Sequence, residues 1–315
     1  RTGMVVLQRR PPPAGTLARA WRRARIPAPR PPSFSTEALP EANSRVKSLP
    51  TSLVFAACSR LAAAHSSVNL GQGFPSWPTP DFALEAAERS LREGHNQYSK
   101  PGGHPLLTAA IARAYSADFG RALDAESEIV VTAGAQGAIY DVFAAFCEPG
   151  DEAVCIEPAF EMYGQIARLA GVRLKGVPLE GREGGALPAS AQDLTLDPAA
   201  LEAAMGPRTR LLLLNTPHNP TGKVFSRAEH EAVAAVLRRF PRVVAVSDDV
   251  YERHVLESSL SHDRFCTLPG MEGRTVSVHS AGKIFSCTGW RLGFCVAPPH
   301  LAGPVRRAQQ VISFC

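Results

Sequence analysis

The stretch that decides the fold is SAGKIFSCTGWR, residues 280–291, in which small and hydroxyl-bearing residues surround a single lysine, Lys283. A largely β-branched run at 275–278 precedes it and predicts the end of a buried strand. A lysine amine attacks a carbonyl only in its neutral form, which burial and a nearby cation such as Arg291 favour. The pattern is typical of a Schiff-base lysine, although a lone lysine in a polar loop is more often exposed to solvent.

The same stretch offers donors for a phosphate group. Ser280, Ser286 and Thr288 supply hydroxyls, and Arg291 supplies a planar guanidinium fork that matches phosphate oxygens. We therefore expect an anionic group close to Lys283.

Length and composition are typical of a soluble globular protein. The chain has 315 residues, 45% of them hydrophobic and 20% charged, which suggests about two domains and a large core. No apolar run approaches the ~20 residues that a membrane-spanning helix needs, so no membrane partner is predicted. The seven cysteines form no CxxC pair and no cluster with histidine, which favours a reducing compartment and predicts neither a disulfide framework nor a metal site.

The net charge of +5 comes from the N-terminus. Residues 1–36 carry eight arginines and no acidic residue, which leaves 26 Lys and Arg against all 29 Asp and Glu in the rest. We therefore predict no nucleic-acid partner. An Arg-rich, acid-poor N-terminus is typical of a transit peptide. We predict that residues 1–40 form a disordered leader addressed to a mitochondrion or plastid, with a plain tail on a cytoplasmic protein as the alternative.

Strand and helix patterns alternate through residues 128–297, which predicts an α/β fold with a mostly parallel sheet and helices on both faces. In such sheets, ligands bind beyond the carboxyl ends of the strands. Residues suited to a binding site follow five predicted strands: Gly134, Phe160, Asn219, Asp248 and Lys283. Their convergence on one edge is stronger evidence for a site than any one of them alone.

A small-residue turn, Gly134-Ala135-Gln136, joins the strand predicted at 128–132 to a helix. Free backbone N–H groups and the helix dipole favour an anion there, so the turn predicts a phosphate site. Tight packing of the helix on the strand would need the same small residues. The turn is neither GxGxxG nor a P-loop, which argues against a dinucleotide cofactor.

An aromatic ring, a pair of carboxyl groups and an amide follow three other predicted strands. The ring of Phe160 is suited to stack on a planar group, although such a residue is more often part of the core. Asp248 and Asp249 follow the strand at 243–246, and we expect one to point into a site and the other away, with helix capping as the alternative. Asn219, in a loop held rigid by two prolines, can donate and accept hydrogen bonds.

A neutral lysine, a stacking ring, an acid and a phosphate cradle together describe a site for pyridoxal 5'-phosphate. The lysine holds the aldehyde as an imine, and a carboxylate that keeps the pyridine nitrogen protonated makes the ring an electron acceptor. Tyr251 and Asn219 are candidates to hydrogen-bond the phenolic oxygen of the ring. Once a substrate displaces it, the free amine of Lys283 becomes the base that moves the α-proton.

In these motifs the chain resembles the class I, fold-type I aminotransferases, and within them the kynurenine aminotransferase group, also called glutamine transaminase K or cysteine-S-conjugate β-lyase. The matching stretches are Asn69–Pro75, Asn96–Tyr98, Asn215–Pro220, Ser247–Tyr251 and Ser280–Lys283. The resemblance implies the PLP-dependent transferase fold of type I, with a mostly parallel, seven-stranded type of sheet sandwiched by helices and a small α+β domain that is incomplete here.

The resemblance also implies a role for each residue of the site. Lys283 would be the Schiff-base lysine, and Asp248 would pair with the pyridine nitrogen. Asn219 and Tyr251 would bind the ring oxygen, and Phe160 would stack on the ring. The phosphate would be held by Gly134, Ala135, Gln136, Ser280 and Arg291. Tyr98 would reach the phosphate of the other subunit, which implies a homodimer. Gly73 and Asn219 would lie beside the substrate.

The implied activity is transamination from an L-amino acid of the kynurenine, glutamine, methionine or aromatic type to a 2-oxo acid. Elimination from cysteine conjugates begins with the same α-carbanion, so a β-lyase is an alternative. A cofactor-binding but catalytically incomplete fragment is another, because family members continue beyond Cys315 into the part that carries the carboxylate-binding arginine. Two departures are Gln136, where relatives often have an aromatic, and Asp249, where Glu is usual.

These considerations divide the chain into three parts. The leader covers 1–40, an N-terminal arm with part of the small domain covers 41–75, and the large cofactor-binding domain covers 76–315, with the C-terminal small domain mostly absent. Within the arm, apolar residues at helical spacing predict a helix over 45–70.

Overall fold

The computed structural model describes residues 40–75, 77–181 and 188–314. The predicted leader lies outside the described residues except for Pro40. Residues from Asn43 onward form one compact unit. Among the described residues, no helix is both long and apolar enough to cross a membrane.

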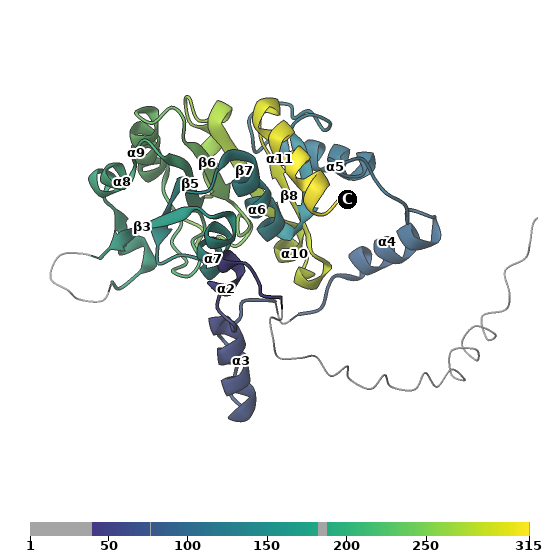
Figure 1. The fold of residues 1–315 in the computed structure, drawn as a ribbon. Coiled ribbons are helices and arrows are strands. Elements are labelled where there is room, and N and C mark those ends of the chain that lie inside the picture. The colour runs from purple at the N-terminus through teal and green to yellow at the C-terminus, as the bar shows by residue number, and fades with distance from the viewer. Residues whose placement is uncertain (1–39, 76, 182–187, 315) are drawn as a thin grey trace, which may run out of the picture. The chain divides into compact units, whose positions relative to one another are not determined.

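A single sheet forms the centre of this unit (Figure 1). Its strands are β1 (Ile129–Ala133), β2 (Glu152–Glu157), β3 (Arg173–Glu180), β4 (Thr195–Leu196), β5 (Thr209–Asn215), β6 (Val244–Asp248), β7 (Thr275–Ser280) and β8 (Leu292–Val296). Their order in space is β1-β8-β7-β6-β5-β2-β3-β4. Because β1 and β7 are both antiparallel to β8, β1 runs in the same direction as the parallel strands, and their carboxyl ends share one edge.

The α/β class predicted from the sequence is confirmed, with a sheet that is mixed. Strands β2, β3, β5, β6 and β7 form a parallel block. Strand β8 is antiparallel to both its neighbours, because the short connection 281–291 leaves no room for a crossover helix. The described residues form eight strands where a seven-stranded type was expected, and the two-residue β4 pairs antiparallel with β3 at the sheet edge.

Helices cover both faces of the sheet. They are α2 (Ser44–Lys47), α3 (Val54–Ala64), α4 (Asp81–Arg92), α5 (Pro105–Tyr115), α6 (Gly134–Phe146), α7 (Glu161–Ala170), α8 (Pro198–Ala204), α9 (Arg227–Arg238), α10 (Ala281–Ile284) and α11 (Pro299–Ile312). Short 3-10 turns lie at Ala191–Asp193, Phe265–Thr267, Glu272–Arg274 and Thr288–Trp290. Helices α6, α7 and α11 pack on one face, and α8 and α9 pack on the other (Figure 1).

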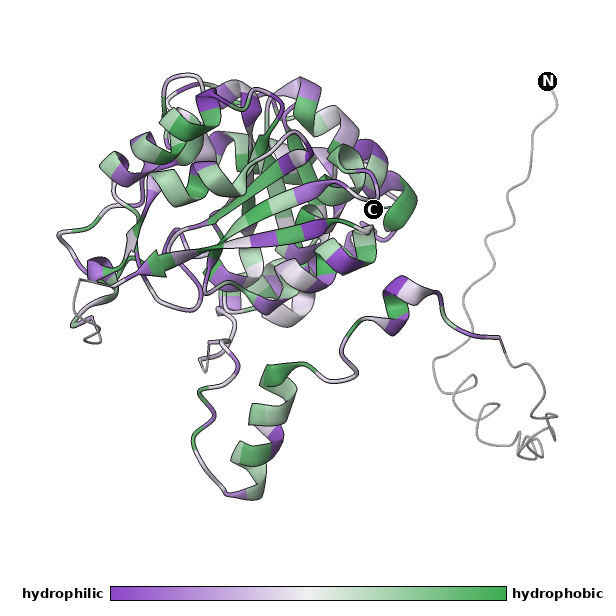
Figure 2. Ribbon diagram, turned by 60° about the vertical axis from the view of Figure 1, so that its left-hand side comes forward, coloured by the Kyte–Doolittle hydropathy of each residue, from purple (hydrophilic) through white to green (hydrophobic). Residues whose placement is uncertain are grey.

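Alternation along the buried strands separates the two cores. In β5, Leu211 and Leu213 pack with α6 and α7, whereas Leu212 and Leu214 pack with α8 and α9. Successive side chains of a strand point to opposite faces, so a strand covered on both sides is apolar throughout. Figure 2 shows this as largely green strands enclosed by helices that carry purple on their outer surfaces.

The single helix predicted over 45–70 is wrong. The structure has two helices there, α2 and α3, with Pro50 between them. Proline has no backbone N–H to donate and disfavours helical backbone in the residue before it, here Leu49. No residue of either helix is buried. The apolar residues at helical spacing therefore do not mark a helix that packs into the core.

Asp141, in α6, is a buried acidic residue whose protonation affects the stability of the fold. Its exposed fraction is 2%, and burial raises the pKa of its carboxyl to about 7. The folded state therefore binds this proton more tightly than the unfolded chain, and stability falls as the pH rises from about 4 through 7. We expect Asp141→Asn to raise the free energy of unfolding at pH 8 by about 1–3 kcal/mol, measured by urea titration. The gain should shrink towards pH 4, and a variant no more stable than wild type at pH 8 contradicts the account.

Candidate active site

A cleft of about 1720 Å³ opens at the carboxyl ends of the central strands. The residues selected from the sequence that line it are Gly73, Ala135, Gln136, Phe160, Asn219, Asp248, Tyr251, Ser280, Lys283, Thr288 and Arg291. These residues come from segments scattered over most of the chain, and the shared edge of β1, β2, β5, β6 and β7 brings them together. The volume exceeds that of a typical small-molecule pocket.

Lys283 lies in the one-turn helix α10, directly after β7. Ser280 caps this helix, since its Oγ accepts a hydrogen bond of 3.3 Å from the Lys283 backbone N–H. The Lys283 Nζ donates to the Gly73 carbonyl at 2.9 Å. Burial lowers the pKa of the Lys283 amine, and the charge of Arg291 lowers it further, while Asp248 acts in the opposite direction. The resulting shift favours the neutral amine that a nucleophile needs.

Asp248 ends β6 and is 4% exposed. Its Oδ2 accepts a hydrogen bond of 2.5 Å from the Tyr163 hydroxyl, whereas its buried Oδ1 has no hydrogen-bond partner among the described residues. Burial raises the pKa of the Asp248 carboxyl to about 6, and the Tyr163 hydrogen bond opposes that rise. A buried, unpaired carboxylate oxygen is costly unless a ligand supplies a donor.

Tyr163 was not selected from the sequence. It lies in α7, three residues after Phe160. Residues three apart in a helix lie on the same face, so its spacing from Phe160 was the only sequence signal that could have placed Tyr163 near the site. The Phe160 ring packs edge-to-face on the Tyr163 ring, with centroids 5.7 Å apart and planes at 88°.

Asn219 and Tyr251 are joined in the cleft by a hydrogen bond of 3.4 Å from the Asn219 Nδ2 to the Tyr251 hydroxyl oxygen. The Lys283 Nζ lies 5.5 Å from the centre of the Tyr251 ring. Asn215, which sequence reasoning gave no role, ties the loop to the sheet. Its Oδ1 accepts from the Asn219 backbone N–H at 2.6 Å, and its Nδ2 donates to the Asp248 carbonyl at 2.8 Å.

The predicted phosphate turn is the N-terminus of α6. Gly134 has a φ of 73°, in the left-handed region that favours glycine. A Cβ at this position would come within 2.6 Å of the Arg291 Nη2, and a Cβ on Gly293 would come within 2.4 Å of the Ala135 nitrogen. The two glycines thus bring the first turn of α6 beside the Arg291 guanidinium. An anion there would meet free N–H groups and a positive charge together.

Gln136, in the first turn of α6, lines the cleft and is exposed. Tyr98 is 83% exposed, does not line the cleft, and packs edge-to-face on the Phe314 ring at 5.1 Å. Its predicted role needs a second subunit and stays a prediction. In the described part of the chain, no group of three or more His, Cys, Asp or Glu is placed to hold a metal ion.

Asp249 faces away from the cleft, so the expectation that the two adjacent acids diverge is confirmed. It is fully buried, accepts a hydrogen bond of 2.7 Å from the Ser247 hydroxyl, and lies 3.7 Å from the Arg264 Nη1. Burial raises the pKa of the Asp249 carboxyl to about 6, while the charges of His279 and Arg264 lower it.

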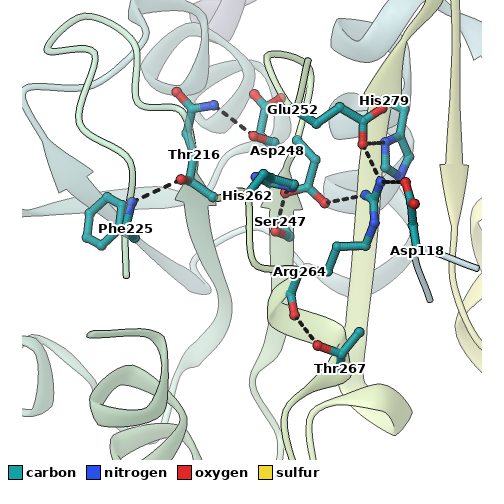
Figure 3. A network of polar contacts seen from close by, with 12 residues as sticks. Asp118, Thr216, Phe225, Ser247, Asp248, Glu252, His262, Arg264, Thr267 and His279 are labelled. Carbon is teal, nitrogen blue, oxygen red and sulfur yellow. Dashed lines mark hydrogen bonds and ion pairs between the residues drawn. The ribbon is translucent and has the colours of Figure 1, made fainter. Parts of the chain in front are cut away.

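Arg264 is the centre of a buried polar network behind the site (Figure 3). Its Nη2 donates to the Glu252 Oε2 at 2.6 Å and to the Asp118 Oδ2 at 2.7 Å. The Tyr115 hydroxyl donates to the Glu252 Oε1 at 2.5 Å. Although burial raises it, the pKa of Glu252 lies well below its usual value because His279 and Arg264 stabilise the ionised form.

A comparison with protein families bears directly on this site. The model of the family described as aminotransferase class I and II matches residues 66–315. The chain belongs to this family. The match contains every cleft residue named above.

Individual aminotransferases extend the comparison. Human kynurenine–oxoglutarate transaminase 1 is 40% identical over 258 residues, which are 80% of this chain and 60% of that protein. The structure of N-succinyldiaminopimelate aminotransferase from Mycobacterium tuberculosis matches with a TM-score of 0.79 and 38% identity, over 87% of this chain and 68% of that one. YbdL from Escherichia coli, for which a methionine aminotransferase function is described, matches with a TM-score of 0.79 and 32% identity, over 88% of this chain and 69% of that one. The expected fold type is confirmed, and the chain spans 60% of the length of the human relative.

The network behind the site gives a stability test. We expect Arg264→Met to lower the free energy of unfolding by about 3–5 kcal/mol, because it leaves the Asp249 and Glu252 carboxylates buried without their shared cation. Arg253 is the matched control, since its Nη2 also contacts the Asp118 Oδ2, at 3.0 Å, but its side chain is 54% exposed. Arg253→Met should cost less than about 1 kcal/mol. Equal losses in urea titrations of the two variants would contradict this assignment.

Proposed function

We propose that this chain carries the cofactor site of a pyridoxal 5'-phosphate-dependent transaminase, which moves an amino group from an L-amino acid to a 2-oxo acid. One observation carries the proposal: a lysine with a lowered pKa, Lys283, shares a cleft with a buried carboxylate, Asp248, that has one oxygen unpaired. Membership of the aminotransferase family supports the same cofactor.

The residues present fit this cofactor at three points. The unpaired Oδ1 of Asp248 is an acceptor suited to a protonated pyridine nitrogen. The first turn of α6 and the guanidinium of Arg291 offer donors and positive charge to a phosphate. The partly desolvated amine of Lys283 is suited to attach to an aldehyde.

When bound, the cofactor supplies an electron sink for the bond broken at the α-carbon of the amino acid. The side chains of the cleft supply the rest. Asp248 would hold a proton on the ring nitrogen, Asn219 and Tyr251 would hold the ring oxygen, and Phe160 would pack on the ring face. The amine of Lys283, once free, would take the α-proton of the substrate and return it.

The substrate class we propose is an amino acid of the kynurenine, glutamine, methionine or aromatic type. The names of similar proteins support it, since they include kynurenine–oxoglutarate transaminases and a methionine aminotransferase. Elimination from cysteine conjugates needs the same removal of an α-proton by Lys283. We therefore propose β-lyase activity as a side reaction on substrates whose β-carbon carries a good leaving group.

We also propose a homodimer in which Tyr98 of each subunit reaches the phosphate bound by the other. The exposure of Tyr98 outside its own cleft supports this, and sedimentation of the cofactor-loaded protein as a monomer would count against it.

For residues 1–40 we propose a mitochondrial or plastid address, supported by the arginine-rich composition. A fusion of this segment to a fluorescent protein tests the address, and a diffuse cytosolic signal would argue against it.

Lys283→Ala tests the attachment of the cofactor. We expect the purified variant, mixed with pyridoxal 5'-phosphate, to lack the visible absorption band that the wild-type protein develops, because the cleft loses the lysine amine that would bind the aldehyde. Lys100→Ala is the control, since Lys100 lies on the surface and pairs with Glu126, and it should keep the band. An unchanged band in the Lys283 variant sinks the assignment.

Titration of the loaded protein with L-kynurenine tests transamination. We expect the visible band to convert to that of the aminated cofactor. In Asp248→Asn the conversion rate should fall about 10²- to 10³-fold, because a neutral amide cannot stabilise the charged ring nitrogen. If the band forms but neither kynurenine nor another amino acid changes it, the chain binds the cofactor without catalysing transfer. A near-normal rate in Asp248→Asn would refute the role of that carboxylate.

A further inference from the structure

Tyr163 contacts the acid of the proposed site but does not line the cleft. It lies in α7, is 3% exposed, and its hydroxyl donates to the Asp248 Oδ2 at 2.5 Å. Burial and the adjacent Asp248 charge raise the pKa of the Tyr163 hydroxyl well above its usual value. The hydroxyl is therefore protonated at neutral pH and can donate a hydrogen bond to Asp248.

This contact determines which carboxylate oxygen is available. A carboxylate on a short side chain can turn about its last bond, and a broad range of orientations is accessible to an unrestrained Asp. Here Oδ2 is held by Tyr163, while the main chain of Asp248 is held by the hydrogen bond from the Asn215 Nδ2 to its carbonyl. With both ends fixed, Oδ1 is left as the unpaired acceptor.

Tyr163 also fixes the aromatic residue of the site. Its ring packs edge-to-face on Phe160, and its backbone N–H donates to the Phe160 carbonyl at 3.0 Å. One side chain thus contacts two groups that reach the cleft from different elements, Phe160 at the start of α7 and Asp248 at the end of β6.

We propose that Tyr163 is a positioning residue for the cofactor, which aims Oδ1 of Asp248 at the ring nitrogen and holds Phe160 in place. The inference rests on the proposed function. Loss of the hydroxyl would let the carboxylate turn and would remove a hydrogen bond that favours its ionised form. A protonated ring nitrogen would then meet a weaker and less ordered acceptor.

Tyr115 provides a matched control. Its hydroxyl also donates to a buried carboxylate at 2.5 Å, the Oε1 of Glu252, and it is 7% exposed. It belongs to the network around Arg264 and does not line the cleft. Tyr115→Phe and Tyr163→Phe therefore remove equivalent hydrogen bonds, and only the second touches the acid of the proposed site.

The experiment measures the dissociation constant of pyridoxal 5'-phosphate by equilibrium absorbance titration between pH 5 and 8, for wild type and both variants. We expect Tyr163→Phe to weaken binding about ten- to a hundredfold at pH 7 and to move the acidic loss of affinity to higher pH. Tyr115→Phe should leave both quantities unchanged. The melting temperatures of the cofactor-free variants should fall to similar extents, which separates positioning from general stability.

A double-mutant cycle gives an independent check. In the Asp248→Asn background, Tyr163→Phe should weaken binding by much less than in wild type, because its partner is already altered. Equal affinities for Tyr163→Phe and Tyr115→Phe, or additive effects in the cycle, would overturn the positioning role alone. Failure of the wild-type protein to bind the cofactor would overturn the proposed function with it.

Discussion

A carboxylate that is buried and must stay charged is the constraint on which the site depends. Asp248 is almost fully enclosed at the end of β6, and an uncompensated charge there would be expensive. The hydroxyl of Tyr163, the backbone N–H of Val250 and the charge of Lys283 all favour the ionised form. They compensate Asp248 only in part, since its pKa still lies at about 6. What is missing is one donor on Oδ1, and a protonated ring nitrogen would supply it.

The sheet meets this constraint by its topology. Strands β5, β6 and β7 run parallel side by side, so Asn215, Asp248 and Ser280 reach the same edge. The divergence of Asp248 and Asp249 then separates two environments. Asp248 faces a cleft that contains an amine with a lowered pKa, whereas Asp249 lies in the buried polar network around Arg264.

The sequence predicted those parts that local chemistry determines. A strand ending in a chemically distinctive side chain is visible from a few residues, so Lys283, Asp248, Asn219, Phe160 and the turn at Gly134 could be selected and placed on one edge. Contacts that join distant segments were not visible. Tyr163 meets Asp248 across 85 residues of chain and Tyr115 meets Glu252 across 137, and neither carries a local motif. The helix predicted over 45–70 was too long: the apolar residues at helical spacing lie in α3 or at its N-cap, and Pro50 separates α3 from α2. The role of Tyr98 stays a prediction.

The most direct test of the central claim, that the strand ends assemble around one reactive lysine, is chemical trapping. The protein would be loaded with pyridoxal 5'-phosphate, reduced with borohydride, digested and mapped by mass spectrometry. We expect the cofactor to be fixed to the peptide containing Lys283, with the buried Lys223 and the surface lysines unmodified. Trapping on another lysine with Lys283 unmodified, or no trapping at all, would contradict it.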